Sequence, residues 1–303
     1  MKTAIRSFVL VLALALSSPL ALAEGFRILS WNISYNAFEK EAEEFQSLLQ
    51  WADPDIALLD EVHPSVPLDN LHVALATLRP DDNETWQVNY GASGGRQRDI
   101  IASRAPLEAL PEFSSKVPYP EDERQYIHER MSDKERAFPN LTMDNGIPVN
   151  AAIVLVGGRR LLAVITDLQC CGDDADSWQE YRRQVEAREI RQRIERVLER
   201  TNVDGLIIAG DFNLVTGLAA AEILNEPYEI CPGGLSTAEL YHPDGVTQWT
   251  WNGRGMPFPN GRLDFQFYCS DTLEMRSGFV LENDAAAETG RHRPLVAEYA
   301  WKL

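Results

Sequence analysis

A carboxylate and an amide follow an apolar run within the segment Ile207–Asn213. The apolar residues predict a buried strand, and the glycine before Asp211 lets the chain turn sharply where that strand ends. Asp211 and Asn213 are two residues apart, so on extended backbone their side chains would point the same way. A carboxylate can orient a water molecule or take its proton, and an amide can donate to a phosphoryl oxygen. The segment therefore predicts hydrolytic chemistry at a sheet edge, with a strand followed by an Asx turn as the structural alternative.

Five further polar residues follow or interrupt apolar runs in the same way. They are Asn32 after FRILSW, Glu61 after IALLD, Asp167 after LLAVIT, Asp264 within RLDFQF, and His292 just before the last apolar run. A fold that brings strand ends to one edge would place these groups together. The ordinary alternatives are a surface acid (Glu61), a turn cap (Asn32), an ion-pair partner of Arg262 (Asp264) and a loop histidine (His292).

The elements that would position these residues are short apolar strands interleaved with helices. We predict strands at Phe26–Asn32, Asp55–Val62, Trp86–Tyr90, Asp99–Ser103, Ala151–Val156, Leu161–Leu168, Leu206–Asp211, Val246–Trp251, Leu263–Cys269 and Pro294–Trp301. We predict helices at Lys40–Trp51, Leu68–Leu78 and Ser177–Arg200, the last opened by a Ser177–Glu180 capping box, and a short one near Leu218–Leu224. This order lacks a regular βαβ repeat and favours two stacked sheets with helices outside. The charged, proline-bearing segment Glu112–Pro148 predicts a long ordered insertion.

The N-terminus has the pattern of a secretory signal. Lys2 and Arg6 precede an apolar run at Phe8–Leu16, and Ala21-Leu22-Ala23 supplies a small-x-small cleavage site. We expect cleavage after residue 23, export to the periplasm or the medium, and one domain over residues 24–303. The apolar run is too short to span a bilayer comfortably, and no later stretch is long and apolar enough, so no membrane span is expected.

The chain is strongly acidic, with a formal net charge of −18. Loss of Lys2 and Arg6 with the signal would make it more negative. Duplex DNA is bound mainly through basic contacts to phosphate, so this charge argues against tight, non-specific binding of long nucleic acid. A small phosphate ester in a local basic pocket remains compatible, because net charge governs encounter and not the chemistry of a site.

Four cysteines are present, and export would make disulfides plausible. They are Cys170, Cys171, Cys231 and Cys269, and four cysteines allow three pairings that sequence cannot distinguish. We expect the adjacent Cys170 and Cys171 to reach different partners. A zinc site is not expected, because the chain contains no CxxC spacing.

Five of these segments together resemble one protein family. The segments SWN, DEV, GDFN, RLDFQF and HRPLV occur in the order seen in the endonuclease/exonuclease/phosphatase superfamily, the DNase I-like metal-dependent phosphoesterases, and the resemblance runs from about Phe26 to Tyr299. Each segment alone is weak evidence, but five in order are specific. The resemblance implies a four-layer α/β/β/α sandwich, in which two stacked mixed sheets are flanked by helices and the site lies at one sheet edge.

The resemblance also implies a metal site. Glu61 would be the main ligand of a divalent cation, and Asn32 would help at the metal or at the phosphate. Mg²⁺ is the expected ion, with Mn²⁺ or Ca²⁺ as alternatives, and oxygen ligands suit all three.

The remaining roles implied by the resemblance concern water and phosphate. Asp211 would orient or activate the attacking water, and Asn213 would bind the phosphoryl group. Asp264 would hold His292 so that a charged imidazole faces the phosphate. A histidine held by a carboxylate has a fixed tautomer and favours its cation, which agrees with this role.

The chain departs from the family pattern at two positions. Asp167, in Thr166-Asp167-Leu168, stands where the family usually has a histidine that contacts phosphate. Arg291 stands where the family usually has an aspartate that helps to hold the metal. We hypothesise that the two changes compensate, with Arg291 close to Asp167 or to the phosphate, and that Asp167 could replace the lost metal ligand.

The sequence thus favours an exported, metal-dependent phosphoesterase that acts as a monomer on a small phosphate ester, more a diesterase than a monoesterase. A secreted nuclease is an alternative, for which Arg96, Arg98, Arg104 and Arg159-Arg160 could supply basic groups. A non-catalytic relative that binds a phosphate-bearing ligand or a partner is another, because both departures fall in the site. Retention of the other site residues argues against that reading.

Overall fold

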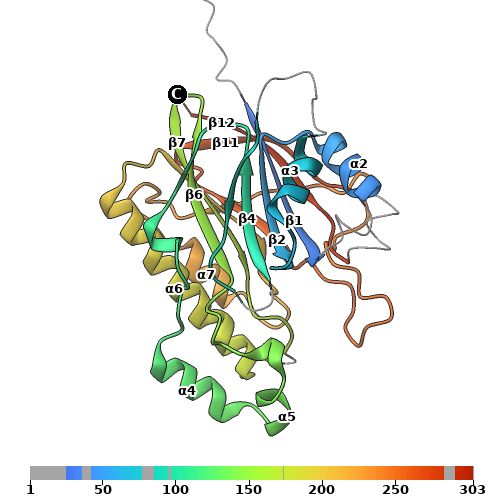
Figure 1. The fold of residues 1–303 in the computed structure, drawn as a ribbon, viewed down its shortest axis with the longest axis vertical. Coiled ribbons are helices and arrows are strands. Elements are labelled where there is room, and N and C mark those ends of the chain that lie inside the picture. Colours follow the sequence, from blue (N-terminus) through green and yellow to red (C-terminus); the bar gives the residue numbers. More distant parts are fainter. Residues whose placement is uncertain are drawn as a thin grey trace, which may run out of the picture.

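Two six-stranded sheets are stacked between helices in the computed structural model, which describes residues 25–35, 42–76, 85–94, 97–172, 174–282 and 291–302 (Figure 1). The first sheet contains β1 (Phe26–Tyr35), β2 (Ile56–Val62), β3 (Gln87–Tyr90), β4 (Arg98–Ser103), β11 (Leu273–Val280) and β12 (Leu295–Trp301). The second contains β5 (Leu107–Ala109), β6 (Val149–Val156), β7 (Arg159–Asp167), β8 (Gly205–Asp211), β9 (Ser236–Thr237) and β10 (Asp264–Tyr268). The predicted signal at residues 1–23 and Arg96 lie outside the described residues.

The strand order is β11-β12-β1-β2-β4-β3 in the first sheet and β5-β6-β7-β8-β10-β9 in the second. The pairs β1–β2 and β7–β8 are parallel, and the other pairs are antiparallel. Both sheets are therefore mixed, as predicted. Since the two parallel pairs are central in their sheets, four strand ends can meet at one edge of the sandwich.

Helices cover the outer face of each sheet. On the first sheet they are α2 (Ala42–Ala52) and α3 (Leu68–Ala76), and on the second α6 (Trp178–Arg200) and α7 (Ala219–Asn225). The remaining helical segments are α4 (Glu121–Arg130), α5 (Asp133–Arg136) and the 3-10 turns η1 (Pro111–Phe113) and η2 (Pro139–Leu141). One apolar cluster joins the first sheet to α2 and α3, and another joins the second sheet to α6, α7 and the insertion. This confirms the predicted four-layer α/β/β/α sandwich. In the described part of the chain, none of the helices has both the length and the apolar character that a bilayer span requires.

A third apolar cluster fills the space between the sheets and changes character toward one end. Along β8 the inner positions are Ile207, Ala209 and then Asp211, because side chains two residues apart share a face. Along β7, Ile165 is followed in the same way by Asp167. The strand alternation that builds the core therefore also delivers carboxylates to the end of the inner layer.

The segment 112–148 is an ordered insertion, as predicted, and it packs against α6. It contains α4 and α5, which extend away from the sheets at the bottom of Figure 1. The Tyr119 hydroxyl lies 2.5 Å from a Glu186 carboxylate oxygen, and Arg182 donates to the Leu141 carbonyl at 3.0 Å. These contacts join the insertion to the helix that flanks the site.

The start of α6 differs in one respect from the prediction. The Ser177 side chain accepts a hydrogen bond from the Glu180 backbone N–H at 3.3 Å, as an N-cap does. The reciprocal bond of a capping box is absent between these two described residues. The Glu180 carboxylate instead lies 2.7 Å from Arg183 and accepts from Thr216 at 3.1 Å. The Glu180 side chain thus forms a buried ion pair and does not accept a hydrogen bond from the Ser177 backbone N–H.

The strand predicted at Val246–Trp251 is wrong. The Asp244 side chain accepts hydrogen bonds from the backbone N–H groups of Val246 and Thr247, both at 2.9 Å, which turns the chain away from any sheet. Val246 is 79% exposed. The edge strand β11 was not predicted, since its exposed Glu274 and a register shift weaken its apolar alternation.

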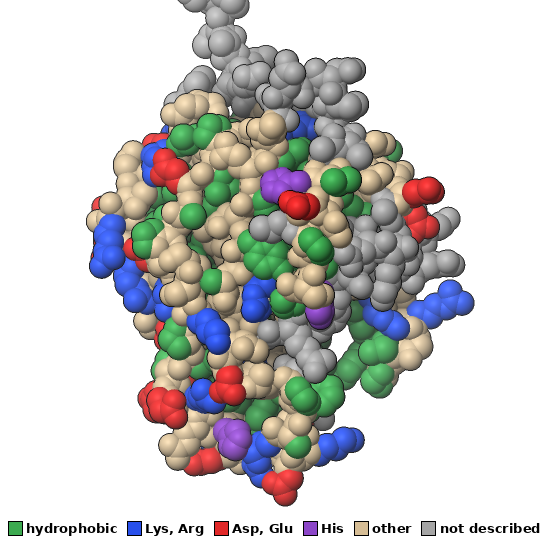
Figure 2. Space-filling model, in the orientation of Figure 1, with side chains coloured by type: hydrophobic (Ala, Val, Ile, Leu, Met, Phe, Trp, Pro, Cys, Tyr) green, Lys and Arg blue, Asp and Glu red, His purple; other side chains and the backbone are tan. Residues whose placement is uncertain are grey.

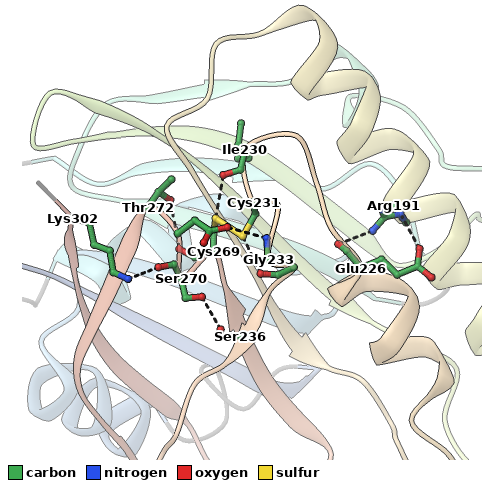
Figure 3. The surroundings of a disulfide bond; sticks show 12 residues. Arg191, Glu226, Ile230, Cys231, Gly233, Ser236, Cys269, Ser270, Thr272 and Lys302 are labelled. Carbon is green, nitrogen blue, oxygen red and sulfur yellow. Dashed lines mark hydrogen bonds and ion pairs between the residues drawn. A yellow bond between two sulfur atoms is a disulfide. The ribbon is translucent and has the colours of Figure 1, made fainter.

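The cysteines form one disulfide, between Cys231 and Cys269, whose Cα atoms are 5.6 Å apart (Figure 3). It ties the turn after α7 to the end of β10. Cys170 and Cys171 are free, and their Sγ atoms are 2.8 Å apart. The expectation that they reach different partners is wrong, because the loop after β7 turns both sulfur atoms toward each other.

Gly210 should be essential for the junction of β7 and β8. Its φ is +129°, and a Cβ there would lie 2.0 Å from the Thr166 carbonyl oxygen. We expect Gly210→Ala to lower the free energy of unfolding by about 3 kcal/mol, from backbone strain and overpacking. Urea denaturation measures this. Gly158→Ala, also at positive φ but with nothing within 4 Å, is the control and should cost about 1 kcal/mol. Equal losses would contradict the steric account.

Candidate active site

Three aspartates lie side by side at the ends of neighbouring strands in the second sheet. In the register of β7, β8 and β10, Asp167 pairs with Asp211, and Asp211 pairs with Asp264. Each is at most 5% exposed. Like charges directly opposite each other destabilise a sheet, and burial removes the water that would solvate them. The arrangement therefore requires bound cations or bound protons.

The first sheet contributes an amide and a fourth carboxylate from the ends of β1 and β2. The Asn32 amide donates to Asp211 Oδ2 at 3.4 Å across the gap between the sheets. Glu61 has a φ of +54°, next to a shift in the β2–β4 register between Leu59 and Val62. This conformation costs a residue other than glycine about 1 kcal/mol. It also breaks the strand alternation, and Glu61 lines the same pocket as Asp211.

His292 and Asp264 form the predicted pair. His292 Nδ1 lies 3.0 and 3.1 Å from the two carboxylate oxygens of Asp264, and Nε2 lies 3.7 Å from Asp211 Oδ2. The Trp31 indole donates to the His292 carbonyl oxygen at 3.1 Å, and the Thr250 hydroxyl donates to Asp264 Oδ2 at 2.6 Å. The imidazole is therefore fixed through both its backbone and its carboxylate partner.

Burial and mutual charge set the protonation of these groups. Burial alone would lower the pKa of His292, but the carboxylates of Asp264 and Asp211 outweigh it and raise that pKa to about 9. Burial raises the pKa of Asp211 to about 7, against the opposing effect of His292. Burial also raises the pKa of Glu61, opposed by His292 and by a hydrogen bond from Asn32. At neutral pH His292 is thus a cation, and Asp211 is close to its midpoint.

Asn213 connects Asp211 to Asp167. Its backbone N–H donates to Asp211 Oδ1 at 2.9 Å, so the Asx turn is present, and its side-chain amide donates to Asp167 Oδ1 at 3.1 Å and to the Leu168 carbonyl at 2.8 Å. The Gln97 amide also donates to Asp167. Burial, with Asp211 as the next contribution, raises the pKa of Asp167 well above its usual value. The turn and the chemical role predicted for this segment are therefore compatible.

Arg291 does not contact Asp167. Its guanidinium donates to the carbonyls of Asn252 at 3.3 Å and Arg254 at 3.0 Å, and the side chain is exposed. Among the described residues Arg291 and Asp167 form no ion pair, so the predicted contact between them is wrong. The physical reason is that two amides already bind the oxygens of Asp167, while a loop holds the guanidinium. Arg291 lines the pocket, and its contact with a phosphate stays a prediction.

The residues present fit a divalent cation. Within the described chain, neither carboxylate oxygen of Asp60 or Asp99 has a hydrogen-bond partner, although both residues are fully buried. Donor atoms of Asp211, Asp264 and His292 lie within 4.8 Å of one another. Carboxylate and amide oxygens are preferred ligands of Mg²⁺, Mn²⁺ and Ca²⁺. Such an ion would neutralise the excess buried negative charge that His292 alone cannot balance.

The site opens into a pocket of about 850 Å³. Apolar side chains from separate segments line it: Phe138 and Leu141 from the insertion, Leu214 and Val215 after β8, and Met256 and Phe258 from the loop before β10. Arg182, Arg262 and Arg291 also line it. A pocket with charged groups converging among apolar walls is typical of small-molecule sites.

Two residues that position site groups were not predicted from the sequence. Gln97 follows the glycine-rich turn and offers no pattern that singles it out, yet it binds Asp167. Thr250, in the loop before β10, holds the Asp264 carboxylate and accepts a hydrogen bond from the Asp264 backbone N–H at 3.0 Å.

The comparisons agree with this architecture. A sequence profile of the Endonuclease/Exonuclease/phosphatase family matches residues 29–287. None of the curated proteins matches the chain.

Similar solved structures include three of this general fold. The human Nocturnin catalytic domain with bound sulfate anion is 17% identical, over 92% of this chain and 94% of that chain, with a TM-score of 0.56. Truncated Caenorhabditis elegans TDP2 is 14% identical, over 91% and 98%, with a TM-score of 0.59. An endonuclease/exonuclease/phosphatase from Bacteroides vulgatus is 14% identical, over 92% and 100%, with a TM-score of 0.56. At these identities the likeness shows the fold alone.

The contact between Asp264 and His292 predicts how the His292 imidazole titrates. In Asp264→Asn the pKa of His292 should fall from about 9 by at least roughly one unit, because the carboxylate that outweighs burial is gone. NMR titration of the imidazole Cε1–H measures this. Asp244→Asn, at an exposed aspartate, is the control and should leave His292 unchanged. An unaltered titration in Asp264→Asn would show that Asp264 does not hold the proton.

The buried acids predict how stability depends on pH and metal. Asp60, Asp99 and Asp167 have pKa values well above those of the unfolded chain, so the stability their protons provide is present below about pH 4 and is lost as pH rises through the folded values. His292 acts with the same sign toward a pKa of about 9. Chelator-treated protein should therefore lose thermal stability between roughly pH 5 and pH 8.

Magnesium should reverse that loss, because it replaces the missing protons. Saturating Mg²⁺ should raise the melting temperature by about 4 °C or more at pH 8 and by clearly less at pH 5, as measured by differential scanning fluorimetry. Glu61→Gln should weaken the effect. A rise that is independent of pH, or a melting temperature of the chelated protein that increases with pH, would refute this account.

Proposed function

The chain belongs to the endonuclease/exonuclease/phosphatase family, and on that basis we propose that it is a divalent-metal-dependent phosphoesterase that hydrolyses small phosphodiesters. One observation carries the proposal: Asp167, Asp211 and Asp264 stand in register at adjacent strand ends. Asp167 and Asp211 share one pocket with Glu61 and His292, and Asp264 binds His292 from behind that pocket. Phosphoester hydrolysis needs an aligned water, a proton acceptor and positive charge at the phosphoryl oxygens. Each requirement is matched by one of these groups.

Asp211 is the residue suited to the water. Its pKa of about 7 lets it accept a proton near neutral pH, where general bases work best. Asn32 and Asn213 hold it from two sides, at 3.4 Å to Oδ2 and 2.9 Å to Oδ1. The carboxylate is thus oriented before substrate arrives, and it takes the proton of the attacking water.

His292 is the residue suited to the phosphoryl group. Asp264 binds its Nδ1, so the proton on Nε2 is directed at the site as part of a cation. A fixed cation at the phosphoryl oxygens stabilises the charge that develops in the transition state. The amides of Asn32 and Asn213 would donate to the same group once substrate binds. Asn213 would do so by exchanging one of its two bonds, to Asp167 and to the Leu168 carbonyl, for a phosphoryl oxygen.

Glu61 and Asn32 would hold the metal ion, and Asp167 could supply the ligand that the aspartate replaced by Arg291 provides elsewhere in the family. When bound, the ion neutralises charge on the phosphoryl oxygens and lowers the pKa of the attacking water. Mg²⁺ is the ion that we propose, with Mn²⁺ or Ca²⁺ as substitutes.

The pocket supports a small ester over a polynucleotide. A diester carries two alcohol groups, and aromatic side chains line the pocket from separate segments, Phe138 from the insertion and Phe258 from the loop before β10. Arg291, exposed at this pocket, is available to the substrate phosphate. We therefore propose a diester whose alcohol groups are apolar or aromatic.

The described residues form no basic groove of the kind that a nuclease would need to bind DNA. Arg98 donates to nearby backbone carbonyls, Arg104 pairs with two aspartates, and Arg160 pairs with Glu108. On the face drawn in Figure 2, blue and red side chains are interspersed over the described residues, with no continuous basic strip. This distribution favours the small substrate.

We also propose that the protein acts outside the cytoplasm as a monomer. The proposal of export rests on the charged start, apolar run and small-x-small site of residues 1–23. The Cys231–Cys269 disulfide is compatible with an oxidising compartment.

The assay that tests the function is turnover of bis-p-nitrophenyl phosphate in Mg²⁺, Mn²⁺ or Ca²⁺. We expect metal-dependent release of nitrophenolate, and a loss of about 100-fold or more in kcat/KM for Glu61→Gln, Asp211→Asn and His292→Ala. His72→Ala, an exposed histidine on α3, is the matched control and should keep wild-type activity.

Three outcomes distinguish the alternatives. Plasmid nicking faster than diester turnover at moderate salt would favour a nuclease. Phosphate binding by folded, metal-loaded protein without turnover of any ester would favour a non-catalytic relative. Equal activity of His292→Ala and His72→Ala would refute the role given to the dyad.

A further inference from the structure

Two adjacent thiols lie in the wall of the active-site pocket. Cys170 is exposed and Cys171 is half-buried, both line the pocket, and their Sγ atoms are 2.8 Å apart. The other two cysteines of the chain are already joined to each other. Cys170 and Cys171 are therefore available to react with each other.

The backbone holds this pair in place. Cys171 has a φ of +71° and Gly172 one of +100°, so the chain makes a tight turn after β7. The Arg183 guanidinium donates to the carbonyls of Gln169 and Cys171, each at 2.7 Å. Arg183 is fully buried and pairs with Glu180 at 2.7 Å. A buried ion pair of α6 thus fixes the turn that brings the two sulfur atoms together.

The two thiols differ in reactivity. A hydrogen bond from Cys170, followed by the charge of Arg183, lowers the pKa of Cys171 to about 7 despite partial burial. The same hydrogen bond raises the pKa of Cys170 well above its usual value. The thiolate is the nucleophile in disulfide exchange, so Cys171 should react first.

The pair is coupled to the catalytic groups through two short connections. The carbonyl of Leu168, two residues before Cys170, accepts a hydrogen bond from the Asn213 amide at 2.8 Å. Arg183 also donates to Thr216 Oγ1 at 3.2 Å, in the loop that carries Asn213. A change in the turn would therefore move the Asn213 amide, which is the group proposed to bind the phosphate.

We propose that Cys170 and Cys171 are a reversible modification site, at which a small-molecule disulfide closes a vicinal disulfide and thereby weakens substrate binding in the pocket. The Cys171 thiolate attacks one sulfur of the small disulfide and releases one thiol. The Cys170 thiol then attacks the Cys171 sulfur of the mixed disulfide and releases the second thiol. The two cysteines lose two hydrogen atoms in total, and the small disulfide is reduced to two thiols.

Such a bond should be easily reversed. Adjacent Cα atoms are about 3.8 Å apart, below the span of ordinary disulfides, and bonds that depart from that geometry are reduced more readily. The Cys231–Cys269 pair, with Cα atoms 5.6 Å apart, lies within the ordinary span. Mild reductant should therefore open the vicinal bond and leave the other intact.

The chemistry is tested on the whole chain with oxidised glutathione, followed by iodoacetamide and peptide mass spectrometry. The peptide with Cys170 and Cys171 should carry two alkyl groups after mild reduction, and none after oxidation, when it should be two hydrogen atoms lighter. Cys170→Ser should accumulate a glutathione mixed disulfide on Cys171. Cys171→Ser should react at least about tenfold more slowly at neutral pH. Full alkylation after oxidation, or equal rates for the two variants, would overturn the assignment.

The effect on the pocket rests on the proposed function and is tested separately. Oxidation should raise KM for bis-p-nitrophenyl phosphate at least about threefold with a smaller change in kcat, and mild reductant should reverse it. In the double variant Cys170→Ser/Cys171→Ser, oxidation should leave KM unchanged. A vicinal disulfide without a change in KM would refute the coupling. Absence of any turnover would count against the proposed function, while the mass measurement would still decide whether the disulfide forms.

Discussion

Buried carboxylates without enough positive charge are the constraint on which this structure depends. Asp167, Asp211 and Asp264 meet in register, and Asp60 and Asp99 lie buried among the same acids without hydrogen-bond partners in the described chain. Removing a charge from water is costly unless it is paired, and His292 is the cation that lies beside Asp211 and Asp264. The sandwich can hold these groups together only by binding protons or a cation, so the same imbalance explains the raised pKa values and underlies the proposal of a metal ion.

The fold produces this imbalance by simple means. Two parallel strand pairs end at one edge, and the alternation that builds the apolar inner layer places an acid at the next inner position of three of these strands: Asp60 in β2, Asp167 in β7 and Asp211 in β8. Glu61 reaches the pocket through a left-handed backbone conformation, and His292 through its bonds to Trp31 and Asp264. Arg183 supports the neighbouring turn, which connects Asn213 to the cysteine pair. The residues proposed for catalysis and the cysteine pair are thus held in place by the same few contacts.

Much of the fold can be predicted from the sequence, because the spacing of apolar residues within a short segment indicates a strand or a helix, and the order of these elements limits the possible folds. The sandwich, most strands and the long helix α6 were predictable in this way. The strand predicted at Val246–Trp251 failed because an aspartate side chain turns the backbone there, and β11 was missed because one face is exposed. The convergence of the acids could be inferred only through the family resemblance, and the absence of contact between Arg291 and Asp167 depends on long-range hydrogen bonds that no local pattern encodes. The roles given to individual site residues stay predictions.

The central claim is that these acids surround one divalent cation. Anomalous diffraction from crystals of the full chain soaked in Mn²⁺ tests it most directly, since the scattering locates the ion without reference to activity. The account predicts one strong peak in the pocket, next to the carboxylates of Glu61 and Asp211. Peaks confined to exposed acidic residues, with none in the pocket at saturating Mn²⁺, would contradict it.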